Sequence, residues 1–367
     1  MAVNSVHFFL QLIRCSLGNQ KEFNTIPSEK DWEQIFLLAQ EQTLLGVLFA
    51  AINNLPPEQK PPTDIYLQWF VLVDKIRNLN DLLNRRTSEA VQTLEQDGFS
   101  CVLLKGQGIS LLYPDPTLRI PGDIDLWVLE DRKSVTDYVQ QKTPGECPVY
   151  HNIPFPLFSD VDMEVHFTPS WSNWLFYNSR LQSFFEANGS AFLENRKTLP
   201  NCNVKIAMPS RFFNAVFILH HIYRHLFGDG IGLRQVFDYY YVIKDGFEKQ
   251  EQVRLIEIYK DIGMYKFASA IMYILNKVFG LPEDLLIIPM NEKEGRYLLN
   301  EIIRAGNFGK YDPRIVHRQD ESKIESFFRI NKQVVRHLFH YPYEVIGSPL
   351  YRIWHFCWRK WNGYSIR

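Results

Sequence analysis

Residues 122–128, Gly-Asp-Ile-Asp-Leu-Trp-Val, alternate polar and apolar side chains over most of their length. Alternation with a period of two predicts a β-strand that has one face on a core. Because successive side chains of a strand point to opposite faces, Asp123 and Asp125 project from the same side. The aliphatic residues between and after them project from the other side. We therefore predict a strand with two neighbouring carboxylates on one face and an apolar row on the other.

Two carboxylates on one face of a strand repel each other unless a cation lies between them. Hard divalent ions such as Mg²⁺ or Mn²⁺ prefer oxygen ligands of this kind. A third carboxylate is expected from residues 161–167, a second alternating segment whose polar face carries Asp162, Glu164 and His166. Glu164 lies mid-strand, so we predict it as the third ligand and keep Asp162 as the alternative. In sites of this type, two ions about 3.5–4 Å apart hold the attacking and leaving oxygens of an in-line displacement.

Helical patterns flank the two strands. Ser28 can cap a helix, with Asp31 in the capping-box position, and an apolar stripe predicts a long helix over 63–96 that ends at Gly98. A short buried strand at 100–104 and a helix at 131–141 surround the acidic strand. Ser210 begins a return to helices, which break at 228–232, resume at 233–244 and continue in three or four more.

These patterns predict the fold class α+β, predominantly helical, with a small mixed β-sheet core flanked by N- and C-terminal helices. The boundaries we expect are an N-terminal helical region at 1–97, an α/β core at 98–205 and a C-terminal helical domain at 206–367. At 367 residues, the chain is long enough to bury a core without disulfides or a structural metal.

Composition excludes several classes of protein. Forty basic and 41 acidic residues give a net charge of −1, without the basic field that nucleic-acid binders usually carry. The five cysteines are scattered and form no Cys-x-x-Cys pair, which argues against a zinc site or a disulfide framework and favours a reducing cytoplasm. Residues 1–14 do not read as a signal peptide, and we expect no membrane span, because no apolar run approaches about 18 residues.

Several motifs, taken in order, resemble the family of uncharacterised bacterial nucleotidyltransferases within the DNA-polymerase-β-like nucleotidyltransferase superfamily. They are Leu104-Lys105-Gly106, Leu112-Tyr113-Pro114-Asp115-Pro116, Arg119, Gly122-Asp123-Ile124-Asp125-Leu126, Glu164-Val165-His166-Phe167 and, on a later helix, Leu233-Arg234 and Asp238. One spacing departs from the superfamily pattern. Gly106 lies 17 residues before the first aspartate (123 − 106) and precedes Gln107, while Gly108 is closer to the aspartate.

The resemblance implies Mg²⁺-dependent (or Mn²⁺-dependent) transfer of a nucleoside monophosphate from a nucleoside triphosphate to an acceptor hydroxyl, with release of pyrophosphate. Backbone N–H groups at Gly106 and Gly108 would hold the triphosphate, and Lys105 and Arg119 would offset its charge. Otherwise Lys105 would be a solvated strand-end lysine. Arg119 would otherwise form a structural ion pair with Asp115 or Asp123.

The acceptor is expected to be a small molecule or a protein rather than a nucleic acid, because the net charge is close to zero. The alternative function is a non-catalytic module on the same fold that binds a nucleotide or a protein. His166 is expected to orient Glu164 by a hydrogen bond, as a neutral histidine commonly does for a carboxylate.

Three further features have structural interpretations. His220, His221 and His225 lack the glutamate of a His-Glu-x-x-His motif, which favours helix packing or pocket lining over zinc. Arg234 and Asp238 are spaced i, i+4, which predicts an ion pair on one helix or, alternatively, a helix face that closes the cleft. The aromatic and basic run 351–361 predicts a docked helix, with contact to a membrane or a partner as the alternative.

Overall fold

The long helix α4, Thr63–Gln96, joins two hydrophobic cores in the computed structural model, which describes residues 3–228, 230–314 and 323–364. Its 34 residues span about 51 Å, since an α-helix rises 1.5 Å per residue. Its first half buries Ile65, Trp69 and Val73 in the larger core, and its second half buries Leu83, Val91 and Leu94 in a smaller one. The predicted bounds are confirmed, and Gly98 follows the helix with a positive φ of 90°.

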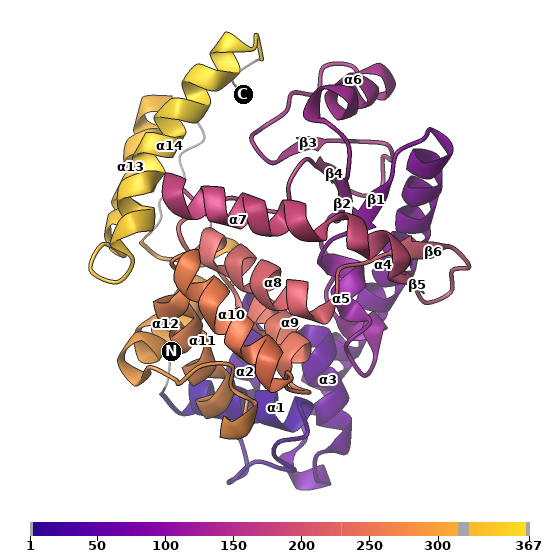
Figure 1. Cartoon of the computed structure of the whole chain (residues 1–367). Helices are drawn as coiled ribbons and strands as arrows, with labels where there is room; N and C mark the ends of the chain where they lie inside the picture. Colours follow the sequence, from indigo (N-terminus) through magenta and orange to yellow (C-terminus); the bar gives the residue numbers. More distant parts are fainter. Residues whose placement is uncertain (1–2, 229, 315–322, 365–367) are drawn as a thin grey trace.

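Three helices precede α4 (Figure 1): α1 Val3–Ser16, α2 Glu29–Glu41 and α3 Leu45–Asn54. Helices α2 and α3 pack against α4, and α1 packs on α2 and α3. The capping box predicted for α2 is present. The Ser28 hydroxyl accepts from the Asp31 N–H at 3.2 Å, and the Asp31 carboxylate accepts from the Ser28 N–H at 3.0 Å. This pair satisfies two of the backbone donors that a helix start leaves unbonded.

The main sheet has the strand order β1-β2-β4-β3. Its strands are β1 Cys101–Leu103, β2 Ile124–Val128, β4 Met163–His166 and β3 Asn152–Pro154. The pairs β1–β2 and β3–β4 are antiparallel, and β2 and β4 run parallel, so the sheet is mixed as predicted. The short helix α5 Gly106–Ser110, the 3₁₀ turn η2 Pro116–Leu118 and the helix α6 Arg132–Lys142 lie in the connections.

The two faces of this sheet belong to different cores. Ile124, Leu126 and Val128 of β2 pack in the smaller core with Met163 and Val165 of β4, as the alternation predicted. On the other face, Val102, Leu104 and Trp127 join the larger, helical core. The polar side chains of β2 and β4 therefore lie between the sheet and the helical body.

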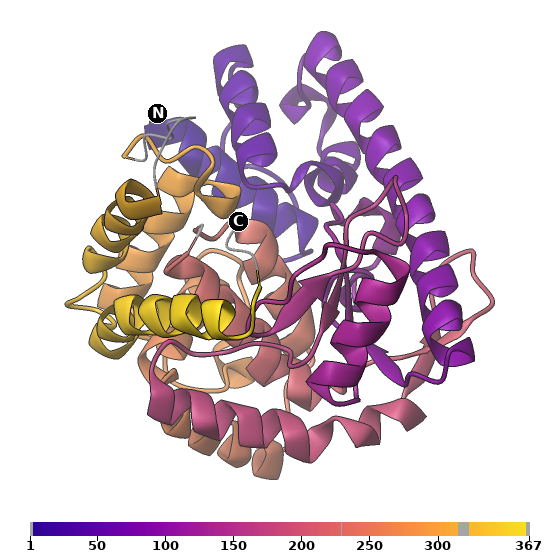
Figure 2. The same ribbon diagram turned by 90° about the horizontal axis from the view of Figure 1, so that it is seen from above.

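The chain after the sheet is mainly helical. The helices and strands are α7 Leu175–Asn188, η3 Ser190–Glu194, β5 Arg196–Thr198, β6 Lys205–Ala207, α8 Arg211–Leu226, α9 Leu233–Ile243, α10 Lys249–Asp261, α11 Tyr265–Lys277, η4 Glu283–Leu285, α12 Glu292–Ala305, η5 Asn307–Gly309, α13 Lys323–Val335 and α14 Pro342–Trp361. The 3₁₀ turn η1 Pro57–Gln59 lies earlier, before α4. Seen from above, α7 crosses one side of the molecule and α14 lies near the C-terminus (Figure 2).

Two sequence expectations about this region need correction. Five helices, α10 to α14, follow residue 244 within the described residues, whereas three or four were expected. Helix α7 and the β5–β6 hairpin were not anticipated. In α7 only Leu181 and Phe185 are fully buried while Leu175 and Phe176 are exposed, so the helix carries no clear apolar stripe. Asp229, within the predicted break at 228–232, lies outside the described residues.

Helix α14 docks by one face, which agrees with the docked-helix prediction. The rings of Tyr351 and Trp354 lie against Tyr150 with centroid distances of 6.1 and 5.5 Å. Other apolar residues of the helix, Leu350, Ile353 and Trp361, are exposed to solvent. None of the helices in the described ranges has the length and apolar character needed to cross a bilayer.

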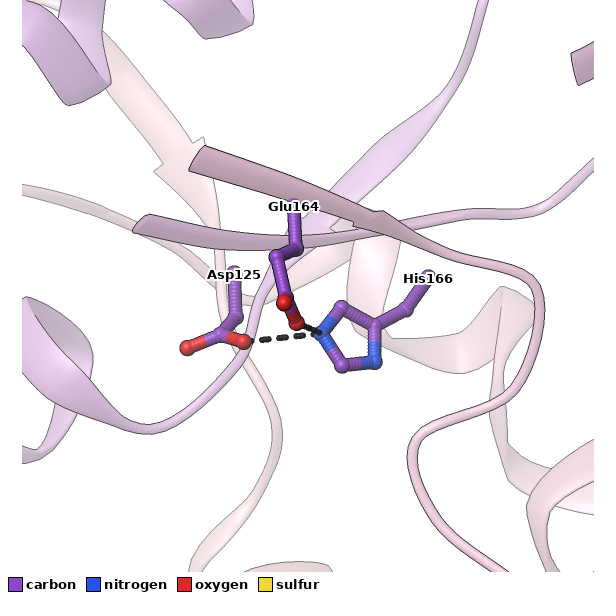
Figure 3. Close-up of side chains that lie close together, drawn as sticks. All are labelled: Asp125, Glu164 and His166. Atoms are coloured by element: carbon purple, nitrogen blue, oxygen red, sulfur yellow. Dashed lines mark hydrogen bonds and ion pairs between the residues drawn. The ribbon is translucent and has the colours of Figure 1, made fainter. Parts of the chain in front are cut away.

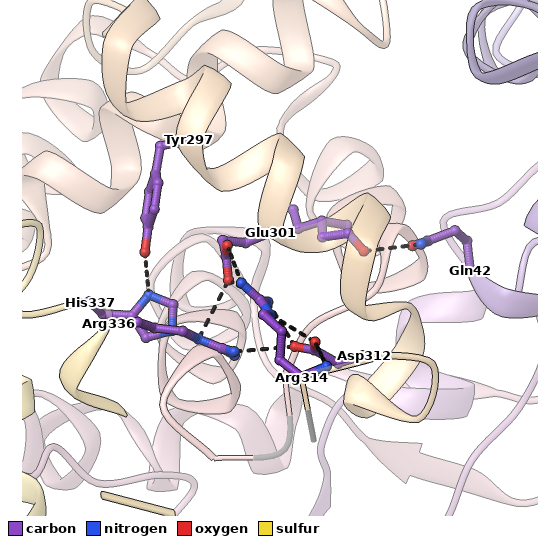
Figure 4. A network of polar contacts seen from close by, with 8 residues as sticks. Gln42, Tyr297, Glu301, Asp312, Arg314, Arg336 and His337 are labelled. Atoms are coloured by element: carbon purple, nitrogen blue, oxygen red, sulfur yellow. Dashed lines mark hydrogen bonds and ion pairs between the residues drawn. The ribbon is translucent and has the colours of Figure 1, made fainter. Parts of the chain in front are cut away.

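Polar contacts connect the N-terminal helices to the C-terminal ones (Figure 4). Buried Gln42 donates to the Ile302 carbonyl at 3.1 Å and accepts from the Leu233 N–H at 2.9 Å, so it links α2 to both α12 and α9. Nearby, Asp312 and Glu301 share Arg314 and Arg336 in a network of ion pairs. Figure 4 also shows His337 of this region bonded to the Tyr297 hydroxyl, at 2.7 Å.

Replacing Gln42 by methionine, Gln42→Met, should lower the free energy of unfolding by about 2–6 kcal/mol. The side chain keeps its size, but two buried backbone groups lose their partners, at roughly 1–3 kcal/mol each. Chemical denaturation would measure the change. Gln68→Met, on the exposed side of α4, is the matched control and should change stability by less than about 0.5 kcal/mol. A Gln42 variant as stable as this control would contradict the linking role.

Candidate active site

Parallel pairing of β2 with β4 brings three predicted site residues together. The register sets Asp125 opposite Glu164 and Trp127 opposite His166. The His166 Nε2 lies 2.7 Å from Asp125 Oδ1 and 3.5 Å from Glu164 Oε2 (Figure 3). Ligand-type atoms of these three side chains all lie within 4.8 Å of one another. The sequence predicted that Asp125 and Glu164 belong to one site, and the strand register places them opposite each other.

His166 contacts a second acid besides the one expected. It lies 3.5 Å from Glu164, which the sequence predicted as its partner, and its shorter hydrogen bond is to Asp125, whose side chain is only 1% exposed. Glu164 is also held by Asn152 of β3, whose amide donates to the Glu164 carboxylate. Because β3 is the edge strand beyond β4, this contact fixes the carboxylate from the side away from Asp125.

Lys105 lies two residues after β1 and reaches Asp125 and Asp123. Its Nζ lies 3.0 Å from Asp125 Oδ2 and 3.8 Å from Asp123 Oδ1, so it is not the solvated strand-end lysine considered from the sequence. Its backbone has a φ of 29°, a conformation that side-chain-bearing residues rarely adopt, and Gly106 follows with a φ of 46°. The turn thus places the ammonium group over the two acids.

Asp123 lies at the rim of the site. It precedes β2, its side chain is 40% exposed, and Lys105 is the cation that contacts it. Of the three predicted metal ligands, Asp125 and Glu164 therefore lie in the close group, and His166 rather than Asp123 completes it.

The charges in the site depend on one another. Burial opposes the charge on His166, but the hydrogen bonds to Asp125 and Glu164 prevail and raise its pKa to about 9. Burial likewise opposes the charge on Lys105, and the nearby Asp123 and Asp125 outweigh it and raise its pKa. For Glu164, the hydrogen bond with His166 outweighs burial and lowers the pKa. At neutral pH Glu164 is therefore an anion, and His166 and Lys105 are cations.

The residues present fit a divalent cation of the hard type. A protonated imidazole has no free lone pair, so the donors that remain are carboxylate oxygens of Asp125 and Glu164, with Asp123 next to them. Oxygen ligands suit Mg²⁺ or Mn²⁺ better than zinc, which prefers nitrogen and sulfur. Lys105 and His166 now contact the carboxylates whose negative charge would attract such an ion.

Arg119 lies elsewhere than the sequence suggested. Its guanidinium binds Asp238 of α9 through two hydrogen bonds of 2.7 Å, and the Tyr113 hydroxyl donates to the same carboxylate at 2.7 Å. Neither Asp115 nor Asp123 is its partner. The pair is buried, so Arg119 connects the segment before β2 to the helical body and is not free to offset triphosphate charge.

Helix α9 contacts that segment a second time through Arg234. Its Nη1 donates to the Ile120 carbonyl at 3.0 Å and to the Pro121 carbonyl at 3.3 Å. The i, i+4 ion pair predicted between Arg234 and Asp238 is absent, because Asp238 gives both oxygens to Arg119. The alternative interpretation, a helix face closing over the site segment, agrees with these contacts.

The glycine turn is supported from α4 by residues that the sequence did not single out. Buried Gln107 donates to Asn84 at 2.6 Å and to Asn80 at 3.2 Å, and Asn80 donates to the Arg119 carbonyl at 2.9 Å. Asparagines spaced i, i+4 within the apolar stripe of α4 were the available signal. The Gly108 N–H already donates to the Lys105 carbonyl at 2.9 Å, so this amide is engaged within the turn.

The histidines of α8 serve packing, as predicted. His220 lies between the Ser170 and Ser172 hydroxyls at 2.9 and 3.0 Å. The rings of His221 and His225 contact each other with centroids 4.4 Å apart. Burial lowers the pKa of all three, so they are neutral near pH 7. In the part of the chain that the structure describes, none of them belongs to a group of three potential metal ligands.

Comparison with known proteins gives one family. Residues 28–280 match the model of a family described as uncharacterised nucleotidyltransferase. Among solved structures, an antigenic nucleotidyltransferase-like protein from Paracoccidioides brasiliensis is similar over 50% of this chain and 92% of its own, with 17% identity and a TM-score of 0.30. A score this low does not establish a common fold. No curated protein matches the chain.

In the metal-free protein, Asp125→Asn should lower the pKa of His166 from about 9 by roughly 1–3 pH units, because an opposite charge at hydrogen-bond distance favours the imidazolium by that amount. Titration of the His166 ring by NMR in the presence of a chelator would measure it. Asp137→Asn, on the exposed face of α6, is the control and should leave the titration unchanged. If the two variants titrate alike, Asp125 is not the group that holds the proton on His166.

Proposed function

The chain belongs to the uncharacterised nucleotidyltransferase family, and on that premise we propose that it transfers a nucleoside monophosphate from a nucleoside triphosphate to an acceptor hydroxyl. The observation that carries the proposal is the pairing of Asp125 with Glu164 across parallel strands, with Asp123 two residues before the first. Membership of the DNA-polymerase-β-like superfamily, a bacterial origin and a cytoplasmic location stay predictions.

In this proposal, Asp123, Asp125 and Glu164 hold Mg²⁺ or Mn²⁺. The bound ion would supply charge neutralisation and Lewis acidity for the phosphates. The protein's own part is to keep the acids ionised and in place. Protonated His166 donates to Asp125, and Asn152 donates to Glu164, so each carboxylate keeps a fixed orientation. Lys105, over Asp123 and Asp125, is placed to meet a phosphate oxygen next to them.

The proposed reaction is an in-line displacement. The acceptor oxygen forms a bond to the α-phosphorus, and the bond from that phosphorus to the α–β bridging oxygen breaks. The electron pair of the broken bond leaves with pyrophosphate. The acceptor proton passes to Glu164, whose side chain is 35% exposed and therefore open to an acceptor, whereas Asp125 is buried.

A cavity beside Lys105 is the place we propose for the acceptor. It measures about 280 Å³ and lies between α5, the β5–β6 hairpin and the start of α8, with Lys197, Arg211 and Asn214 in its wall. Asn214 is buried, and its Oδ1 has no hydrogen-bond partner in the structure. This volume suits a small molecule or a single side chain of a protein, in keeping with the acceptor classes expected from the sequence.

The test is calorimetric titration of ATP and GTP, with Mg²⁺ and with EDTA, into wild type and Asp123→Asn/Asp125→Asn. We expect Mg²⁺-dependent binding that the double variant weakens at least 100-fold, because two of three carboxylates no longer attract the ion. Asp74→Asn/Asp137→Asn removes two exposed acids as a matched control and should bind like wild type.

Equal binding by wild type and the double variant would contradict the metal site and favour the non-catalytic binding module. If binding follows the expectation, labelled nucleotide would then show the acceptor class. Label that appears in protein, together with growth arrest that Asp125→Ala abolishes, would identify a protein-modifying enzyme. Label in small molecules only would identify a small-molecule acceptor.

A further inference from the structure

Arg234 is a buried cation without a carboxylate partner among the described residues. It is 9% exposed and forms no ion pair there, since the nearest acid on its helix, Asp238, is taken by Arg119. Its Nη1 is satisfied by two backbone carbonyls, while its Nε is buried without a hydrogen bond. The ring of Phe308 lies 5.9 Å from the guanidinium carbon.

An unpaired charge in such a place is costly. Burying an ion without a counter-ion costs several kcal/mol, and buried, strongly perturbed groups of this kind are concentrated at functional sites. Burial, followed by the nearby charge of Arg119, lowers the pKa of Arg234 to about 10, so it is still a cation at neutral pH. The structure therefore holds a positive charge ready for an anion.

The position of Arg234 indicates which anion. The two carbonyls that it contacts belong to residues 120 and 121, which lead into Asp123. Helix α9, which carries Arg234, packs against α5, the helix that begins directly after Lys105. Asp123 is also close enough for its charge to act on the guanidinium. Arg234 thus borders the candidate active site from the side of the helical body.

We propose that Arg234 binds the β- and γ-phosphates of the nucleotide, the part that leaves as pyrophosphate. This inference rests on the proposed function and adds a residue to it. A guanidinium offers donors in a fork that matches two phosphate oxygens, and it counters the charge that develops on the leaving group. Arg119, which the sequence analysis expects to offset triphosphate charge, cannot do so while its guanidinium is bound to Asp238. Arg234 lies near Arg119, and its Nε donor has no hydrogen-bond partner.

The experiment compares wild type with Arg234→Gln by calorimetry in Mg²⁺, using pyrophosphate, tripolyphosphate and the monophosphate of whichever nucleotide binds. We expect Arg234→Gln to weaken pyrophosphate and tripolyphosphate at least tenfold and the monophosphate less than twofold. Arg234→Lys keeps the positive charge, and its affinity for pyrophosphate should lie between those of wild type and Arg234→Gln. Arg254→Gln removes an exposed arginine of α10 as the matched control and should match wild type.

Because Arg234 also anchors residues 120 and 121, thermal unfolding of each variant shows that it is folded before it is titrated. Pyrophosphate affinity unchanged in folded Arg234→Gln would overturn the inference and leave the proposed function standing. An equal loss for pyrophosphate and the monophosphate would also overturn it, since a structural anchor affects every ligand alike. A wild type that binds no nucleotide in Mg²⁺ overturns the proposed function together with the inference.

Discussion

The buried carboxylate of Asp125 is the constraint on which the arrangement of the site depends. A charged side chain that is 1% exposed needs partners, and Asp125 has two cations beside it, His166 of β4 and Lys105 of the turn after β1. His166 reaches Asp125 because β4 runs parallel to β2 in this register, and Lys105 reaches it because the turn has an unusual backbone conformation at Lys105. The parallel pairing of β2 with β4, in an otherwise antiparallel sheet, therefore places Asp125, Glu164 and His166 side by side.

A second layer of polar contacts joins this site to the helices. Arg119 and Tyr113 converge on Asp238, and Arg234 holds the carbonyls that precede Asp123, so α9 fixes the approach to β2 from the helical side. From the opposite direction, Asn80 and Asn84 of α4 hold Gln107 and the chain around the glycine turn. The acidic strand is thus positioned by buried hydrogen bonds that come from segments far apart in sequence, and the hydrophobic cores on either face of the sheet support it.

Local sequence patterns correctly predicted the features that depend only on residues close together in the chain. Alternation located β2 and β4 and the face of each strand, the apolar stripe gave both ends of α4, and the Ser28 capping box was read directly. Such patterns could not predict ion pairs and hydrogen bonds between residues that are far apart in the chain. Arg119 meets Asp238 across 119 residues, and the nearer Asp115 and Asp123 were the only partners that the sequence could suggest. Helix α7 was missed because it buries too few residues to show a period, and the preference of His166 for Asp125 over Glu164 depends on strand register.

The continuity of α4 limits how this protein can move. One helix of 34 residues contributes side chains to both cores and has no proline or glycine between them. A hinge motion between the sheet and the helical body would have to bend α4. The same helix carries Asn80 and Asn84, which are hydrogen-bonded to Gln107 in the glycine turn. An unbroken helix that packs into both cores therefore resists bending between the two parts. In the reaction proposed above, Asp125 and its two cationic partners would already be in contact on this frame before a nucleotide binds.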